Sequence, residues 1–171
     1  MQTTGEKHNI HIGMGGWDLH PFNTHFYPQR PNKYFRKLEF YSQFFDCVEI
    51  NSTFYNTSLS SHHSKRWMND VAANRHFMFT AKLFRGFTHT FDATKTDIVS
   101  INKMLDPLLE QGKFGGLVIQ FPYLFTNRHE NRLYVLQLSR IFSRYPLFLE
   151  VRHRSWYSPL MYNFFQQLRL R

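Results

Sequence analysis

Five short apolar segments recur along the chain, and each is followed by a segment whose apolar residues have helical spacing. We expect strands at residues 10–14, 47–51, 77–82, 117–121 and 147–152. We expect helices at residues 31–41, 61–71, 97–109 and 130–142, and from residue 158 onward. Pro107 is expected to kink or end its helix. Strands that alternate with helices predict parallel strands in an α/β fold.

Each predicted strand has two faces, because successive side chains point to opposite sides. One face is apolar, as with Val48 and Ile50 in the second strand. The other face becomes polar toward the end of the strand, with Glu49, Asn51, Lys82, Gln120, Glu150 and Arg152. A doubly wound sheet has helices on both faces and would be apolar on both. Polar strand ends are instead typical of the mouth of a barrel, where active sites of (β/α)₈ barrels lie.

The length of the chain favours a different fold. Five strand–helix units in 171 residues would complete a flavodoxin-like, doubly wound sheet. A (β/α)₈ barrel needs eight units and about 250 residues. The strand faces lead us to predict a TIM-type (β/α) barrel that is incomplete, with about five of the eight units, and the five-stranded doubly wound sheet is the alternative. Residues 1–9 are interpreted as an N-terminal tail and residues 10–171 as one partial barrel domain.

Composition and charge limit the class of protein. The chain is 42% hydrophobic and 18% aromatic, which is sufficient for a globular core. Its one cysteine, Cys47, excludes an internal disulfide and fits a reducing compartment. No segment resembles a signal peptide or approaches the roughly 18 apolar residues of a membrane span, so we expect a cytoplasmic protein without a membrane partner. The net charge of +9 favours anionic partners. Nucleic-acid binding is an alternative that no recognisable motif supports.

Two carboxylates on the polar faces are the candidates for catalysis. Burial would raise the pKa of Glu49 or Glu150 toward the range of a general acid or base, whereas a nearby cation would lower it. Lys82 and Arg152 could supply that charge and bind an anionic substrate. An interior salt-bridge network is an equally good interpretation of these four residues. Lys82 could also form a Schiff base with a carbonyl substrate, although a lysine at a strand end is weak support for this.

Other side chains near the strand ends are candidates for substrate binding. They are Trp17, Asn51, Thr53, Tyr55, Thr88, His89, Gln120, His153 and Trp156. The two tryptophans would form aromatic walls or hydrophobic plugs, and Thr53 could instead stabilise its loop. A metal bound by Glu49, His89, Glu150 and His153 is an alternative, but no short-spaced ligand motif supports it. We therefore assign no metal and leave the cofactor open.

Five segments at the strand ends resemble one known family. The segments GMGGW, CVEINSTFY, FMFTAKLFRGFTH, GGLVIQFP and LEVRHRSW are together similar to the YecE-like family, also called the domain of unknown function 72 family. The resemblance implies a TIM-type barrel with a site at the strand ends, but no reaction, since the family's activity is not established. Members continue for about three more strand–helix units, which implies that this chain is a truncated barrel or one that a second chain completes.

The function predicted from the sequence is correspondingly general. We expect an uncharacterised YecE-like barrel of the enzyme type, which binds a small polar or anionic substrate at the C-terminal mouth of the strands. The alternatives are a basic nucleic-acid-binding protein and a barrel fragment that is inactive on its own. An incomplete barrel would expose two strand edges, so that it would be poorly stable or would associate.

Overall fold

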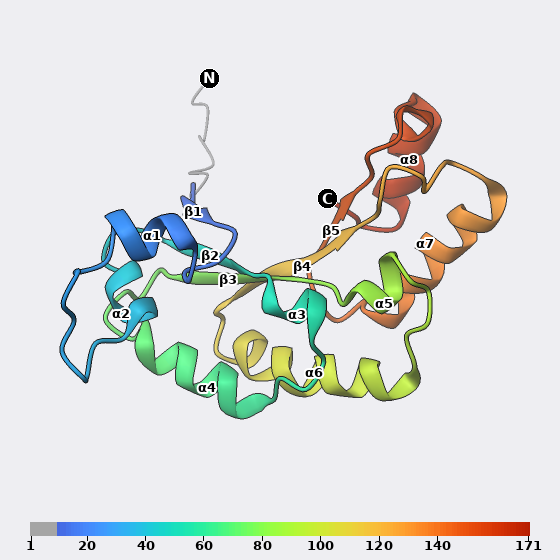
Figure 1. The fold of residues 1–171 in the computed structure, drawn as a ribbon. Helices are drawn as coiled ribbons and strands as arrows, with labels where there is room; N and C mark the ends of the chain where they lie inside the picture. Colours follow the sequence, from blue (N-terminus) through green and yellow to red (C-terminus); the bar gives the residue numbers. More distant parts are fainter. Residues whose placement is uncertain (1–9) are drawn as a thin grey trace, which may run out of the picture.

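The strands form one parallel sheet in the computed structural model, which describes residues 10–171. Its strands are β1 (Gly13–Met14), β2 (Cys47–Ile50), β3 (Met78–Lys82), β4 (Phe114–Gln120) and β5 (Leu147–Glu150). Their order in the sheet follows their order in the chain, from β1 at one side to β5 at the other (Figure 1). The predicted α/β fold with parallel strands is confirmed. The predicted tail, residues 1–9, lies outside the described residues.

Helical segments connect the strands. They are α1 (His20–His25), α2 (Lys37–Tyr41), α3 (Ser52–Tyr55), α4 (Ser61–Asp70), α5 (Arg85–Thr88), α6 (Lys95–Glu110), α7 (His129–Ile141) and α8 (Pro159–Gln167), with a 3₁₀ turn at Arg154–Trp156. The short helices α1, α3 and α5 were not predicted. Pro107 does not end α6, which continues for three more residues to Glu110. Within residues 10–171, every helix falls short of the length and apolarity that crossing a bilayer requires.

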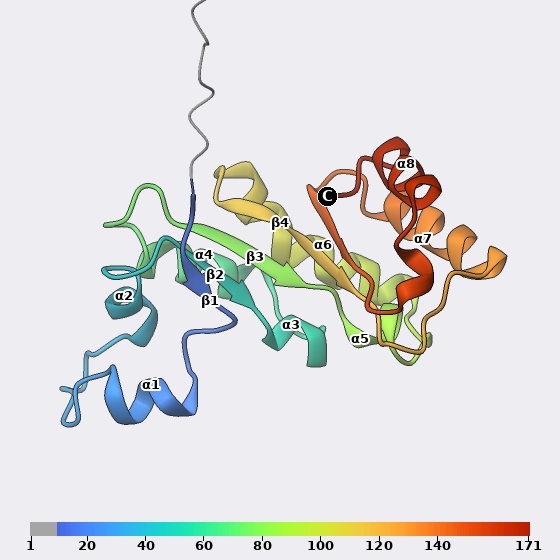
Figure 2. The same ribbon diagram turned by 90° about the horizontal axis from the view of Figure 1, so that it is seen from above.

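The two faces of the sheet differ as the alternation of side chains predicts. On one face Val48, Ile50, Phe79 and Ala81 are almost fully buried. Figure 1 shows α4 and α6 side by side along this face. The opposite face carries half-buried side chains at Cys47, Glu49, Met78, Thr80, Lys82, Val118 and Gln120. Seen from above in Figure 2, strands β2–β4 lie in front of α4 and α6, so the half-buried face is turned away from these helices.

The first strand is shorter than predicted. Only Gly13 and Met14 pair with β2, whereas Ile10 and Ile12 are 82% and 65% exposed. Residues 10–12 were predicted as part of this strand but lie outside it, and β1 lies at the side of the sheet. Glycine is needed at position 13, since a Cβ atom there would lie 1.9 Å from the carbonyl oxygen of Cys47.

The other side of the sheet is extended by the last residues of the chain. After α8, Arg169 adopts a positive φ of 55° and the chain turns back toward β5. Leu170 forms a parallel bridge with Leu147. The Arg171 N–H donates to the Leu147 carbonyl oxygen at 3.0 Å, and the Leu149 N–H donates to the Arg171 carbonyl oxygen at 2.9 Å. These two residues thus occupy the first part of the outer edge of β5.

Candidate functional site

Glu49 projects from β2 onto the half-buried face of the sheet. Burial raises the pKa of its carboxyl group, and the negative charge of Glu150 raises it further, while the positive charge of Lys82 acts in the opposite direction. Burial has the largest effect, so the protonated form of Glu49 persists to a higher pH than in an exposed glutamate. This is the behaviour expected of a group that donates a proton.

Lys82, the last residue of β3, lies over an aromatic ring that the sequence interpretation did not select. Its Nζ atom is 4.5 Å from the centroid of the Phe54 ring, within the range of a cation–π contact. The His89 ring meets the same phenyl ring nearly edge-on, with a centroid distance of 4.9 Å and an interplanar angle of 87°. Phe54 is in α3, directly after β2. Its position in the STFY segment at the end of that strand is the sequence feature that could have identified it as part of the site.

His89 follows α5 and lies among cations. Burial lowers the pKa of its imidazole, and the charges of Lys82, Arg152 and Arg85 lower it further. Its Nδ1 atom is 2.8 Å from the hydroxyl oxygen of Thr88, which is fully buried. The sequence interpretation missed Arg85, although this residue stands only three positions after the end of β3. The neutral imidazole is therefore favoured beside three positive side chains.

Glu150 ends β5 and accepts two hydrogen bonds. Gln120 Nε2 donates to one carboxylate oxygen, and Arg152 Nε donates to the other at 2.9 Å. Burial opposes ionisation of this carboxyl group, but these two hydrogen bonds and the charges of Arg152 and Lys82 outweigh it, so that the pKa of Glu150 is lowered. The ion pair is accessible to solvent, with side chains 45% and 52% exposed.

The remaining polar candidates mainly hold the strand ends together. The Thr53 hydroxyl lies 2.6 Å from both the Ile50 and the Lys82 carbonyl oxygens, and so links the ends of β2 and β3. Asn51 Nδ2 donates to the Gly15 carbonyl oxygen at 2.8 Å and ties β2 to the loop after β1. These bonds support the positions of Glu49 and Lys82.

The aromatic and histidine candidates occupy different environments. Tyr55 is 70% exposed. Trp17 meets Trp67 edge-on and lines a cavity of about 310 Å³ together with Asn51. His153 Nδ1 accepts a hydrogen bond from the Ser155 N–H at 3.2 Å and caps the 3₁₀ turn.

Trp156 does not lie on the half-buried polar face. It is fully buried, and its indole N–H donates to the Phe125 carbonyl oxygen at 2.7 Å. Of the two roles proposed for it, the hydrophobic plug describes its position, because an aromatic wall at the mouth would need an exposed ring. It therefore supports the segment that follows β5 from within the core.

A metal site at the strand ends is not formed by the predicted ligands. Among residues 10–171, no three histidine, cysteine, aspartate or glutamate side chains are grouped closely enough to hold an ion. Glu49, His89, Glu150 and His153 therefore do not make a ligand set. The groups that do interact are two carboxyls with opposite pKa shifts and the cations around them. Such an arrangement can bind a polar or anionic group and transfer a proton.

Comparison with known proteins places the chain in a family. Residues 11–171 match the family described as "Protein of unknown function DUF72". The chain belongs to the DUF72 family. Within it, the chain is 29% identical over 159 residues to the UPF0759 protein YunF of Bacillus subtilis (strain 168). The match covers 90% of this chain and 54% of YunF, so the chain spans about half the length of that relative. The resemblance inferred from the strand ends is thus confirmed.

Solved structures of DUF72 proteins share the fold. A DUF72 family protein from Thermotoga maritima MSB8 superposes with a TM-score of 0.76 at 23% identity, over 95% of this chain and 63% of that protein. A second, from Enterococcus faecalis V583, gives a TM-score of 0.72 at 21% identity, over 95% of this chain and 62% of that protein. At these identities the likeness concerns the fold alone. Both solved proteins are longer than the part that this chain matches.

Proposed function

We propose that this DUF72 chain binds a small polar or anionic substrate on the half-buried face of its sheet, at the C-terminal ends of the strands. Glu49 would act as the proton donor and Glu150 as the proton acceptor, while Lys82 and Arg152 would hold negative charge on the substrate. The observation that carries the proposal is the opposite direction of the two pKa shifts on one face of the sheet. Environments that separate the pKa values of two acids also separate their roles.

We further propose that the five strand–helix units are part of a TIM-type barrel. Support comes from the strand order, in which β1 is at the side of the sheet. A flavodoxin-like sheet has the order 2-1-3-4-5 and places its first strand inside. The half-buried polar face gives further support, because a doubly wound sheet would cover it with helices. In a barrel, the four proposed residues would lie around one mouth.

The cations define which substrates to test first. His89 is held toward its neutral form by Lys82, Arg152 and Arg85, and a substrate anion would reduce this effect by compensating their charge. Small carboxylates and inorganic phosphate are therefore suitable probes. Titration of each probe into the protein, followed by the NMR signals of His89, should show saturable changes and a rise in the pKa of His89.

Matched substitutions test the assigned roles. Lys82→Met is expected to weaken binding of the probe about tenfold, which corresponds to about 1.4 kcal/mol. Lys103→Met, at an exposed position of α6, should leave binding unchanged. Glu49→Gln and Glu150→Gln are compared with Glu110→Gln, which is exposed at the end of α6. Unchanged binding in Lys82→Met and in both strand-end glutamine variants, with folding intact, would contradict the proposal.

A further inference from the structure

A cavity of about 310 Å³ lies at the C-terminal ends of β1 and β2. The two segments that follow these strands form its wall, with Gly15, Gly16, Trp17, Asp18, Leu19, Asn51 and Ser52. Asn51 follows directly after β2, two positions from Glu49, which is a separation of about 7 Å in an extended chain. The cavity therefore adjoins the proposed substrate site. Its volume is at the lower end of the range of ligand pockets, about 300–1,000 Å³, and suits a molecule with a single ring.

The polar side chains of this wall keep hydrogen-bonding groups for a ligand. Lys37 Nζ and Asn23 Nδ2 both donate to Oδ1 of Asp18, at 2.5 and 3.1 Å. These bonds hold the carboxylate in place and leave its Oδ2 atom without a donor among residues 10–171. Asn51 is held through its Nδ2 atom, which donates to a backbone carbonyl of the loop after β1 at 2.8 Å, so its Oδ1 atom remains an acceptor. The exposed hydroxyl of Ser52 can donate or accept.

Trp17 gives the same cavity an apolar wall. Its indole ring meets Trp67 edge-on, with a centroid distance of 5.6 Å and an interplanar angle of 74°. The Tyr27 hydroxyl donates to the Trp17 carbonyl oxygen and fixes the backbone there. The ring is therefore in place before any ligand arrives, and Leu19 adds apolar surface beside it. A cavity with one aromatic wall and several acceptors matches a ring that has C–H groups on its faces and hydroxyl groups around its rim.

The charges around the cavity limit the class of ligand. The hydrogen bond from Lys37 lowers the pKa of Asp18, so the carboxyl group is ionised at neutral pH. A carboxylate in the wall repels an anion. Because Lys37 forms an ion pair with the same carboxylate, the negative charge is already compensated and offers little attraction to a cation. The cavity therefore favours a neutral ligand.

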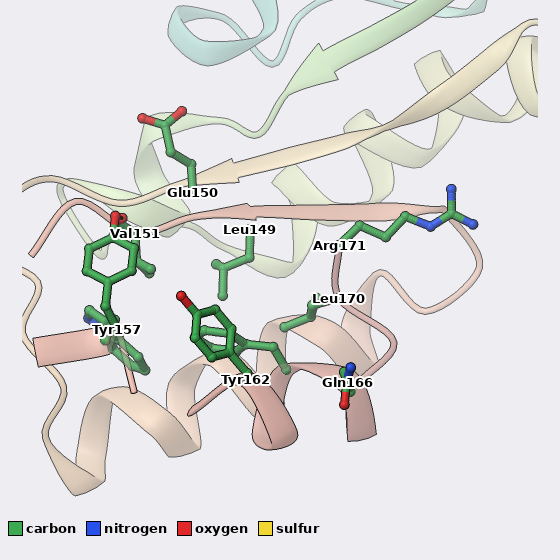
Figure 3. A pocket seen from close by; sticks show the side chains of 10 residues that line it. Leu149, Glu150, Val151, Tyr157, Tyr162, Gln166, Leu170 and Arg171 are labelled. Atoms are coloured by element: carbon green, nitrogen blue, oxygen red, sulfur yellow. Dashed lines mark hydrogen bonds between the residues drawn. The ribbon is translucent and has the colours of Figure 1, made fainter. Parts of the chain in front are cut away.

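The cavity between β5 and α8 does not suit such a ligand. It measures about 390 Å³ and is lined mainly by apolar side chains. Figure 3 shows Leu149 pointing from β5 toward Tyr162 on this side, whereas Glu150 points to the opposite side of the sheet. The acceptors that a hydroxylated molecule needs are thus found at the ends of β1 and β2.

We propose that the cavity after β1 and β2 binds a neutral, hydroxylated ring, of which a pyranose sugar is the simplest example. Hydroxyl groups of the ring donate to Asp18 Oδ2 and Asn51 Oδ1, and another exchanges a hydrogen bond with the Ser52 hydroxyl. One C–H face of the ring lies against Trp17. The site requires neither Lys82 nor Arg152, so it goes beyond the proposed binding of anions.

Titration with neutral sugars tests the proposal. The probes are D-glucose, D-galactose and D-mannose, and the control is the acyclic polyol D-sorbitol. At least one pyranose should cause saturable changes in the NMR signals of the Trp17 indole N–H and the Asn51 side-chain amide. The indole N–H of Trp156, which is buried elsewhere, should not change. Sorbitol should bind at least about tenfold more weakly, because ordering its flexible chain costs conformational entropy that a ring does not lose.

Two variants with matched controls locate the binding. Trp17→Leu removes the aromatic wall and should weaken binding about tenfold, as followed by the Asn51 amide. Tyr34→Leu removes a ring that is 76% exposed and does not line the cavity, so it should have no effect. Asp18→Ala should also weaken binding about tenfold, whereas Asp92→Ala, at an exposed position outside the cavity, should not.

Several outcomes would overturn the proposal. They are the absence of saturable changes with every pyranose, equal binding of sorbitol, and equal effects of the cavity variants and their controls. The aspartate pair decides the matter if Trp17→Leu fails to fold. Lys82→Met should leave pyranose binding unchanged while it weakens the binding of carboxylates and phosphate, so failure of this proposal is distinguishable from failure of the proposed function. Loss of pyranose binding in Lys82→Met would assign the sugar to the anion-binding residues instead.

Discussion

Glu150 and Gln120 are register partners on β5 and β4, and Gln120 Nε2 donates a hydrogen bond to the Glu150 carboxylate. Glu49 lies on the same face of the sheet, but no described side chain or backbone group donates a hydrogen bond to its carboxyl. A hydrogen bond to the charged form of an acid lowers its pKa, and burial without such a bond raises it. A hydrogen-bond donor is present at Glu150 and absent at Glu49, and this difference moves the pKa values of the two carboxyls apart.

Glu49→Gln should stabilise the protein at neutral pH. Because the pKa of Glu49 is raised in the folded state, the ionised carboxylate lowers stability at pH values above its folded pKa. This effect disappears at pH values below the unfolded pKa, where both states are protonated. We expect the Tm of the variant to exceed that of the wild type by about 1–3 °C at pH 7, and to equal it below pH 4. Calorimetry at both pH values measures the difference.

Glu150→Gln should have the opposite effect. The pKa of Glu150 is lowered by folding, so its ionised form stabilises the protein above the unfolded pKa, and this contribution is lost as the pH falls through the folded pKa. The loss at pH 7 should stay below about 1 kcal/mol, because the ion pair with Arg152 is exposed to solvent. Urea unfolding at pH 7 and at acid pH provides the test. A stabilised Glu150→Gln variant at pH 7 would show that burial dominates this site as well.

Lys82→Met should raise the pKa of two neighbours at once. The charge of Lys82 lowers the pKa of Glu49, and it also lowers the pKa of His89. Removing the charge should therefore move both values upward, whereas Lys103→Met should move neither. NMR titration of the Glu49 carboxyl carbon and the His89 ring protons measures both in one sample. A shift in only one of the two pKa values would mean that the charge of Lys82 acts on only one of the two groups in solution.

Gly13→Ala is expected to disrupt the pairing of β1 with β2. Its Cβ would lie 1.9 Å from the Cys47 carbonyl oxygen, so the two backbones must separate, at a cost of about 3 kcal/mol or more. Gly115→Ala in β4 is the matched control, since its nearest contacts would be at an ordinary 3.5 Å. Urea unfolding monitored by circular dichroism should show a lowered midpoint for the first variant alone. Equal midpoints would place β1 farther from β2 than the structure does.

Trp156→Phe is expected to destabilise the protein by about 1–3 kcal/mol. Phenylalanine retains most of the apolar surface, but it leaves the buried carbonyl oxygen of Phe125 without the indole N–H that now donates to it. Trp17→Phe is the comparison, because Trp17 is only half-buried. This substitution should lower the free energy of unfolding by less than Trp156→Phe does. Urea unfolding followed by circular dichroism measures both. A smaller loss at Trp156 than at Trp17 would contradict its role as a buried plug.

Much of the sheet could be predicted from the sequence, because the pattern of residues that indicates a strand lies within the strand itself. Alternation of apolar and polar residues located β2 and β3 to within a residue or two, and it identified the face on which Glu49 and Lys82 lie. The same rule extended the first strand to Ile10 and Ile12, which lie outside β1. The family's strand-end segments coincide with the region in which we propose the substrate site.

The contacts within the site could not be predicted in the same way. Phe54 and His89 are 35 positions apart, and only the fold brings their rings together beside Lys82. Arg85 stands four positions before His89, across the short helix α5, which was not predicted from the sequence. Thr53 looked like a ligand-binding hydroxyl or a loop residue, yet it bonds to two strand ends. Such roles depend on tertiary neighbours.

The agreement between strand order and chain order bears on how the protein is synthesised. Each new strand pairs with the strand made immediately before it, from β1 to β5. Domains begin to fold from the N-terminus while the ribosome is still translating, and contacts between nearby segments form faster than distant ones. The sheet can therefore grow by one strand at a time during translation, because each new strand pairs with the strand that was added last. A pause between units would leave the finished strands already paired.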